Sequence, residues 1–498
     1  MTSTRFAAII MFFVMVFFQA VEVELGIRDK VDVTWPTRTE KTTECLTRDY
    51  HWVITENRYT SQTASQEADE GIGHVLSFGG INPDIVNSSC SCADGYIVCG
   101  NSSSVNTNIS GVAKKNGYSL PYGFIIKFSA SGDAVWADSI GGNGVTSVSD
   151  VAVLKDGSVV AVGYSMATNL INKDAPESTA INAFVYRYSP SGTLLHSYVL
   201  KSDGFDYAYC VAPLHDGGYI IGGKTNSSSG DFSFISGNSS AYILAFDSSD
   251  NIVNHTAISG TTGGTFMDIA VDESGSIFAC CYTNCSNGDF AVFDGLGAGG
   301  IDSLILKYSS ELSLEWSYVI GGAGEDNFNN IIPDDEGGCL VAGSYRTVHD
   351  SGTQTGTFED IHNWGGEDGY AFFINSEGLV YNSREIAGFY DDVVSSVIRV
   401  GNYYCFTGYT KSENRTFNGF SNAGGNDAYV LFTDLTGRGV AVCSINGSDE
   451  DYAYTVCACG DYVVACGTTS STDGTFSLAV PRITDAQTGF SVTVLLPQ

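Results

Sequence analysis

Cysteines form the most regular set of reactive side chains in this chain of 498 residues, which holds 14 of them. Three of them near the N-terminus recur with identical spacing near the C-terminus: Cys90, Cys92 and Cys99 match Cys457, Cys459 and Cys466. Thiols of exported proteins oxidise, so the pattern predicts disulfides that join or brace these two segments. The alternative is that they are small buried apolar side chains. Zinc is disfavoured, because no histidine or carboxylate stands nearby at ligand spacing.

Aspartates recur at a second regular position, at the start of a short apolar run. The members are Asp84, Asp206, Asp326, Asp391 and Asp451. If these runs are the innermost strands of a ring, the carboxylates surround one mouth of its channel. Such a ring could hold Ca²⁺, which takes oxygen ligands. The alternative, which the sequence favours, is that each aspartate caps its own tight turn through its side chain.

A long polar insertion between Tyr345 and Asp368 holds a tryptophan and two histidines. Trp364 could stack on a sugar ring, and His349 with His362 could contribute to a metal or ligand site. Polar loops with one aromatic residue also serve as packing covers, which is the competing interpretation.

Recognised catalytic motifs are missing from the sequence, which lacks GxSxG, GxxxxGK[ST] and HExxH. Adjacent carboxylates such as Asp334 and Asp335 point to opposite faces when they lie on a strand, which suits shared acid–base chemistry poorly. The sequence therefore does not indicate an enzyme.

The elements that position these side chains follow from an internal repeat. Residues 216–225, DGGYIIGGKT, join a glycine turn to an apolar strand, and close copies begin at 94, 156, 275, 336, 402 and 461. Each copy belongs to a unit of about 60 residues with four short apolar runs, which is typical of four strands. Seven units predict an all-β chain, a seven-bladed β-propeller of four-stranded antiparallel blades. The last unit lacks a fourth strand, and an orphan strand at about 74–80 is predicted to complete that blade and close the ring.

Three segments carry a resemblance to a known family: CYTNCSNGDF at 281–290, IDSLILKY at 301–308 and IGGAGEDNF at 320–328. They resemble the secreted β-propeller repeats often called SBBP-type, and the resemblance covers about residues 74–498. It implies an exported or surface protein and supplies no catalytic residues. The many cysteines and the segment before residue 73 depart from the pattern of the family.

The N-terminus predicts export. Residues 1–20 place Arg5 before an apolar run that is short for a membrane span, as in a signal peptide; an uncleaved anchor is the alternative. Residues 21–72 are predicted to be an N-terminal extension, and residues 73–498 the propeller. Nine Asn-x-Ser/Thr sequons are candidates for glycosylation: Asn87, Asn101, Asn108, Asn226, Asn238, Asn254, Asn284, Asn414 and Asn446.

The net charge of −33 disfavours nucleic acid and anionic lipid as partners, because the electric field of a negatively charged protein repels them. No membrane insertion is expected after signal removal. We therefore expect a secreted or cell-surface propeller that acts as a non-catalytic binding or structural module and contacts protein or glycan through its loop-rich face. No cofactor is expected unless the aspartates hold Ca²⁺. The alternative is a secreted enzyme acting on polysaccharide, with carboxylates at the channel mouth.

Overall fold

The computed structural model describes the backbone of residues 34–36 and 51–53 and most of residues 71–497. Within the latter range it leaves out residues 106, 110, 113, 116–117, 171–180, 294–299, 323, 347–356, 358–363 and 480–486. The predicted signal peptide and most of the predicted extension thus lie outside the described residues. The chain divides into two compact units, residues 1–58 and 59–498. In the first, β1 (Thr34–Pro36) pairs antiparallel with β2 (His51–Val53).

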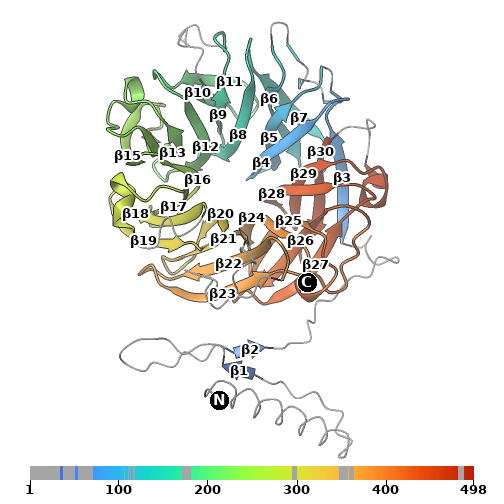
Figure 1. The fold of residues 1–498 in the computed structure, drawn as a ribbon. Helices are drawn as coiled ribbons and strands as arrows, with labels where there is room; N and C mark the ends of the chain where they lie inside the picture. The colour runs from blue at the N-terminus through green and yellow to red at the C-terminus, as the bar shows by residue number, and fades with distance from the viewer. Residues whose placement is uncertain are drawn as a thin grey trace, which may run out of the picture. The chain divides into compact units, whose positions relative to one another are not determined.

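The second unit is a ring of seven four-stranded antiparallel sheets, the blades of a β-propeller (Figure 1). Blades 1 and 2 are β4 (Asp84–Cys92), β5 (Gly95–Ser102), β6 (Tyr122–Ser129), β7 (Ala134–Ile140), then β8 (Thr146–Val153), β9 (Val159–Ser165), β10 (Asn182–Tyr188), β11 (Leu194–Val199). Blades 3 and 4 are β12 (Asp206–Pro213), β13 (Tyr219–Thr225), β14 (Ser239–Phe246), β15 (Ile252–Gly260), then β16 (Gly264–Val271), β17 (Ile277–Thr283), β18 (Asp302–Tyr308), β19 (Leu314–Ile320). Blades 5 and 6 are β20 (Glu325–Pro333), β21 (Cys339–Arg346), β22 (Asp368–Ile374), β23 (Val380–Ile386), then β24 (Asp392–Val400), β25 (Tyr403–Thr410), β26 (Asp427–Asp434), β27 (Gly439–Ile445). Blade 7 consists of β28 (Asp451–Cys459), β29 (Tyr462–Thr469), β30 (Thr488–Leu495) and β3 (Ile72–Phe78).

Short 3₁₀ helices are found in four of the loops between second and third strands: η2 (Gly230–Phe232), η3 (Gly288–Val292), η5 (Arg415–Phe417) and η6 (Gly474–Leu478). Among the helices of the described residues, none has the length and apolar character that crossing a membrane requires. The prediction of an all-β, seven-bladed propeller is confirmed.

The repeated glycine motif forms the second strand of each blade. In blade 3 the turn before β13 contains Gly217, whose φ of +91° is a conformation that side chains disfavour. Tyr219, Ile220 and Ile221 are then all fully buried, although they point alternately to the two faces of the sheet. Both faces are buried because a neighbouring blade covers each of them, which explains why the motif reads as a continuous apolar run.

The predicted closing strand is confirmed. β3 pairs antiparallel with β30, with Val75 opposite Val492 and Phe78 opposite Gly489, and so supplies the fourth strand of blade 7. Phe78 is 2% exposed and contacts the rings of Phe124 and Phe128 in blade 1. This strand therefore completes blade 7 as its fourth and outermost strand and also packs on blade 1.

One end of the ring, called here the junction face, carries the loops that lead from one blade to the next. First strands begin there, second strands end there and third strands begin there, as shown in blade 3 by the pairing of Asp206 with Thr225 and of Thr225 with Ser240. The first strands lie innermost in the ring (Figure 1). A junction is named below by its two blades, so that junction 3/4 joins blades 3 and 4.

Candidate functional site

Four of the five predicted aspartates occupy equivalent places on the junction face, namely Asp84, Asp206, Asp326 and Asp451. Asp84 and Asp451, at the starts of β4 and β28, are at most 1% exposed. The carboxylate of Asp451 accepts hydrogen bonds from Thr469 Oγ1 at 2.6 Å and Ser471 Oγ at 2.8 Å, both in its own blade. Within the described parts of the chain, no three His, Cys, Asp or Glu side chains form a group suited to a metal ion. Ca²⁺ binding therefore stays a prediction, while the bonds are those of aspartates that hold their own turns.

One member of this aspartate set was wrong by one residue. Asp392, not Asp391, pairs with Thr410 between the first and second strands of blade 6, as Asp206 pairs with Thr225 in blade 3. Asp391 is exposed, and its Oδ1 accepts a hydrogen bond from the backbone N–H of Glu367 at 3.1 Å. Because the two aspartates are adjacent, the sequence motif alone could not distinguish them, and strand register decides between them.

A second set of buried aspartates begins the third strands, and the sequence reading missed it. Across three consecutive junctions each member faces the first-strand aspartate of the next blade: Asp302 with Asp326, Asp368 with Asp392, and Asp427 with Asp451. All six are at most 1% exposed. Burial raises the pKa of Asp326, Asp392, Asp427 and Asp451 to about 7, and in the first three the charge of the facing aspartate adds to the rise. The repeated aspartate before the apolar third strands was the available signal.

Trp364 does not offer both faces of its ring to a sugar. The guanidinium of Arg415, from η5 in the next blade, lies over the ring at 3.8 Å from its centroid. Arg415 is itself ion-paired to Glu385 at 2.7 Å. This arrangement fits the interpretation of the insertion as a packing cover. The two histidines predicted beside it, His349 and His362, lie outside the described residues.

The six matched cysteines lie on neighbouring blades at the seam where the ring closes. Cys90, Cys92 and Cys99 pack in the core between blades 1 and 2, whereas Cys457, Cys459 and Cys466 pack in the core between blades 7 and 1. All 13 cysteines that the structure describes are free thiols. Burial raises the pKa of Cys457 to about 12. The first set thus packs toward blade 2, whereas the second packs toward blade 1, which carries the first set. Disulfide formation stays a prediction.

The sequons differ in how their asparagines are used. Asn226, Asn238 and Asn284 are exposed. In contrast, Asn87 Nδ2 donates hydrogen bonds to Ser147 Oγ at 3.0 Å and to the carbonyl of Val148 at 2.7 Å, which ties it to the next blade. The partly buried asparagines are Asn87, Asn101, Asn108, Asn254, Asn414 and Asn446.

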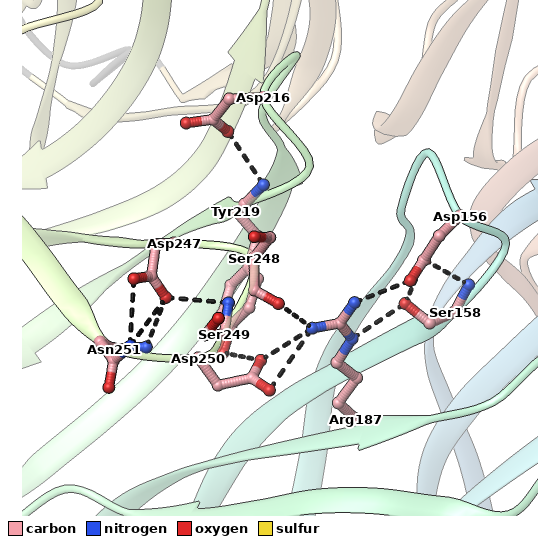
Figure 2. Close-up of polar contacts among 11 residues, drawn as sticks. Asp156, Ser158, Arg187, Asp216, Tyr219, Asp247, Ser248, Ser249, Asp250 and Asn251 are labelled. Carbon is pink, nitrogen blue, oxygen red and sulfur yellow. Dashed lines mark hydrogen bonds and ion pairs between the residues drawn. The ribbon is translucent and has the colours of Figure 1, made fainter.

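A buried arginine at the opposite end of the ring is structural. Arg187, on β10, is 8% exposed, and Figure 2 shows its guanidinium between blade 2 and blade 3. Its nitrogens contact Asp156 Oδ2 at 2.8 Å, the carbonyl of Ser248 at 2.9 Å and Asp250 Oδ1 at 3.3 Å. Because protein acceptors surround the guanidinium, this cluster clamps two blades together and is not a candidate for ligand binding.

A pocket lies on the junction face between blades 3 and 4, and no sequence motif predicted it. Its volume is about 380 Å³. We call it the Lys224 pocket. Three aromatic residues line it, Phe205, Tyr207 and Tyr282, and Phe205 is 50% exposed. The ammonium of Lys224 lies 4.9 Å from the centroid of the Tyr207 ring. The other described lining residues bring hydroxyl, amide and backbone groups: Thr225, Asn226, Ser239, Thr262, Gly263, Gly264, Thr265, Thr283, Asn284 and Ile301.

Two adjacent glycines, Gly263 and Gly264, form part of the wall of this pocket. Gly263 has a φ of +68°, and a Cβ there would lie 2.4 Å from Ser239 Oγ and 2.7 Å from the Ser239 carbonyl carbon. A side chain at this position would therefore force blades 3 and 4 apart. Two exposed sequons, Asn226 and Asn284, stand among the lining residues, so a glycan on either one would adjoin the pocket.

Comparisons with known proteins do not assign the chain to a family. No family model matches the chain, and no curated protein matches it. The WD40 domain of Neurospora crassa Pan2 is similar at 9% identity over 86% of this chain and 98% of that one, with a TM-score of 0.44. BBS1N in complex with ARL6DN is similar at 8% identity over 86% of this chain and 97% of that one, with a TM-score of 0.41. A Bacteroides caccae protein of unknown function is similar at 12% identity over 66% of this chain and 97% of that one, with a TM-score of 0.35.

Proposed function

We propose that the protein is an exported, non-catalytic binding module, secreted or held at the cell surface, and that it binds a saccharide in the Lys224 pocket. The composition of that pocket carries the proposal. Saccharide sites combine aromatic rings, which cover the apolar face of a sugar, with hydroxyl and amide groups that bond to its hydroxyls. Phe205, Tyr207 and Tyr282 supply the rings here, and threonine and asparagine side chains supply the polar groups.

Other features of the chain agree with export of such a module. A short apolar segment follows Arg5 near the N-terminus, and nine sequons follow it. The resemblance to secreted propeller repeats points the same way. A protein partner on the junction face is the alternative occupant that the sequence left open, and the exposed rings of Phe389 and Tyr390 belong to that face.

The alternative of an enzyme that cleaves polysaccharide draws no support from the predicted carboxylates. Asp84, Asp206 and Asp451 are buried and accept hydrogen bonds from hydroxyl groups of their own blades. A glycosidase instead presents a pair of carboxyl groups on both sides of the scissile bond. We therefore propose binding without turnover.

A comparison of two exposed phenylalanines tests the proposal. Phe205 is 50% exposed in the pocket, and Phe389 is 56% exposed in the loop that leads into blade 6. On an oligosaccharide array followed by calorimetry with the full mature chain, Phe205→Ala should weaken binding of the recognised sugar by about tenfold, since loss of a ring that contacts the ligand costs more than about 1 kcal/mol. The matched variant Phe389→Ala should bind as the wild type does. Equal effects of both substitutions, or no sugar bound by the wild type, would refute the proposal.

A further inference from the structure

At junctions 5/6 and 6/7 an acidic side chain occupies the position that corresponds to Gly263 in the Lys224 pocket. At junction 6/7 the carboxylate of Glu450 accepts hydrogen bonds from the backbone N–H of Asn426 at 3.0 Å, from Asn426 Nδ2 at 2.8 Å and from the Tyr452 hydroxyl at 2.7 Å. At junction 5/6, Asp391 Oδ1 accepts from the backbone N–H of Glu367 at 3.1 Å. In both junctions an acidic residue just before the first strand of one blade binds the residue just before the third strand of the preceding blade.

Strand register identifies the same positions at junction 3/4. Gly264 pairs with Thr283 as Asp451 pairs with Thr469, so Gly263 occupies the position of Glu450. Ser240 pairs with Thr225 as Asp427 pairs with Thr410, so Ser239 occupies the position of Asn426. Thr265 likewise occupies the position of Tyr452. Junction 3/4 thus keeps polar groups at two of these positions, a serine and a threonine that both line the pocket, and lacks the acidic residue.

Lys224 adds a positive charge at this junction. The residues that correspond to it at junctions 5/6 and 6/7 are neutral: Ser344 in blade 5 and Tyr409 in blade 6. Among the described residues that line the pocket, Lys224 is the only charged one, and it forms no ion pair with a described carboxylate. Lys127 and Arg346, in contrast, are paired with acidic residues at 2.7 and 2.8 Å. The unpaired ammonium group of Lys224 favours an anionic ligand in this pocket, against the repulsion from the chain's net charge of −33.

We propose that the Lys224 pocket recognises an acidic saccharide, whose carboxylate or sulfate group occupies the place that Asp391 fills at junction 5/6 and Glu450 fills at junction 6/7. This inference rests on the proposed function and adds the class of ligand. The anionic group would bond to the hydroxyls of Ser239 and Thr265 and to the ammonium of Lys224. The sugar ring would then lie against the exposed ring of Phe205, at the mouth of the pocket.

Paired ligands that differ only in charge test the inference. Calorimetry of the full mature chain would use oligogalacturonate with its methyl ester, sialyllactose with lactose, and a sulfated chondroitin oligosaccharide with its desulfated form. The ionic strength should be about 0.15 M, where the Debye length of about 8 Å screens the distant negative charges and leaves contacts with Lys224 largely intact. The wild type should bind at least one acidic member about tenfold more tightly than its neutral counterpart.

Lys224→Met keeps the apolar stem over the Tyr207 ring and removes the charge. It should weaken binding of the acidic ligand about tenfold and change binding of the neutral one less than about twofold. Lys201→Met is the matched control, because the Lys201 ammonium also lies over a tyrosine ring, 5.9 Å from the Tyr198 centroid, but outside the pocket. It should leave both affinities unchanged.

The outcomes separate this inference from the proposed function. If the wild type binds the neutral members as tightly as the acidic ones, or if Lys224→Met weakens both equally, the acidic class is wrong and saccharide binding still stands. If the wild type binds no saccharide at all, the proposed function fails and this inference fails with it. The sulfated pair, compared with the two carboxylate pairs, shows which anionic group is recognised.

Discussion

Replacing Asp427 with asparagine should stabilise the ring at pH 8 and change its stability little at pH 4. Asp427 and Asp451 face each other across junction 6/7, and burial together with the charge of Asp451 raises the pKa of Asp427 to about 7. An unfolded aspartate has a pKa of about 3.9, so between pH 4 and 7 the folded state binds more protons than the unfolded state. The stabilising contribution is therefore full below about pH 4 and is lost as the pH rises through about 7.

The size of this loss of stability follows from the shift in the pKa of Asp427. A rise from 3.8 to about 7 corresponds to roughly 4 kcal/mol at about 1.36 kcal/mol per pKa unit. The junction lies at a loop surface where solvent screens the charge, so we expect about half of that value, about 2 kcal/mol, from Asp427. Asparagine removes this dependence and keeps the shape of the side chain. The molecule already contains this arrangement at junction 2/3, where Asn182 begins the third strand opposite Asp206.

The assay is urea unfolding followed by circular dichroism at pH 4, 6 and 8, for the wild type and for Asp427→Asn. The variant should match the wild type at pH 4 and exceed it by about 2 kcal/mol at pH 8. Asp203→Asn is the control with the same change in net charge, because Asp203 is exposed and hydrogen bonds from Ser227 and Ser229 lower its pKa. It should show no gain at pH 8. The reasoning would be refuted if the two variants behaved alike, or if the wild type became more stable as the pH rose.

Two further substitutions test the packing of the ring. Arg187→Met should destabilise the fold by about 3 kcal/mol or more, because it leaves the Asp250 carboxylate, whose side chain is only 10% exposed, without its cation. Arg346→Met, which breaks the ion pair between an exposed arginine and the partly buried Glu367, should cost about 1 kcal/mol or less. Equal costs of the two substitutions in urea titrations would contradict the role of Arg187 in joining the two blades. Phe78→Ala should destabilise the fold by about 3–5 kcal/mol, because it leaves a cavity where the closing strand contacts Phe124 and Phe128. Ile81→Ala, at a residue that is 71% exposed, should change the free energy of unfolding by less than about 0.5 kcal/mol. A melting temperature unchanged by Phe78→Ala would show that β3 contributes little to ring closure.

The parts of this molecule that were predictable from sequence are those with local signals. The glycine turn before Tyr219 and the buried run after it recur in every unit, so the count of blades and the displaced strand near Val75 could be deduced. The remaining features of the site are determined by strand register. It separates Asp392 from Asp391, and it shows that Gly263 corresponds to Glu450.

The pocket itself has no signal of its own in the sequence. It depends on a side chain that is missing at Gly263 and on a lysine, Lys224, whose counterparts in other blades are neutral or aromatic. Such a site becomes visible only when equivalent positions of several blades are compared in space. The buried pairs of aspartates, in contrast, could have been found from the sequence, because Asp302, Asp368 and Asp427 stand directly before apolar third strands.

The closing strand has a consequence for the order in which the ring can be assembled. His74 donates its backbone N–H to the hydroxyl of Thr493, a partner 419 residues later in the chain. The first strand of the propeller to be synthesised, β3, therefore waits with its hydrogen-bonding edge unpaired until β30 exists. A chain cut short before β30 leaves β3 without a partner and blade 7 incomplete, and it exposes strand edges that favour aggregation. Only a chain that contains β30 can thus close the ring, and this requirement applies before any ligand binds.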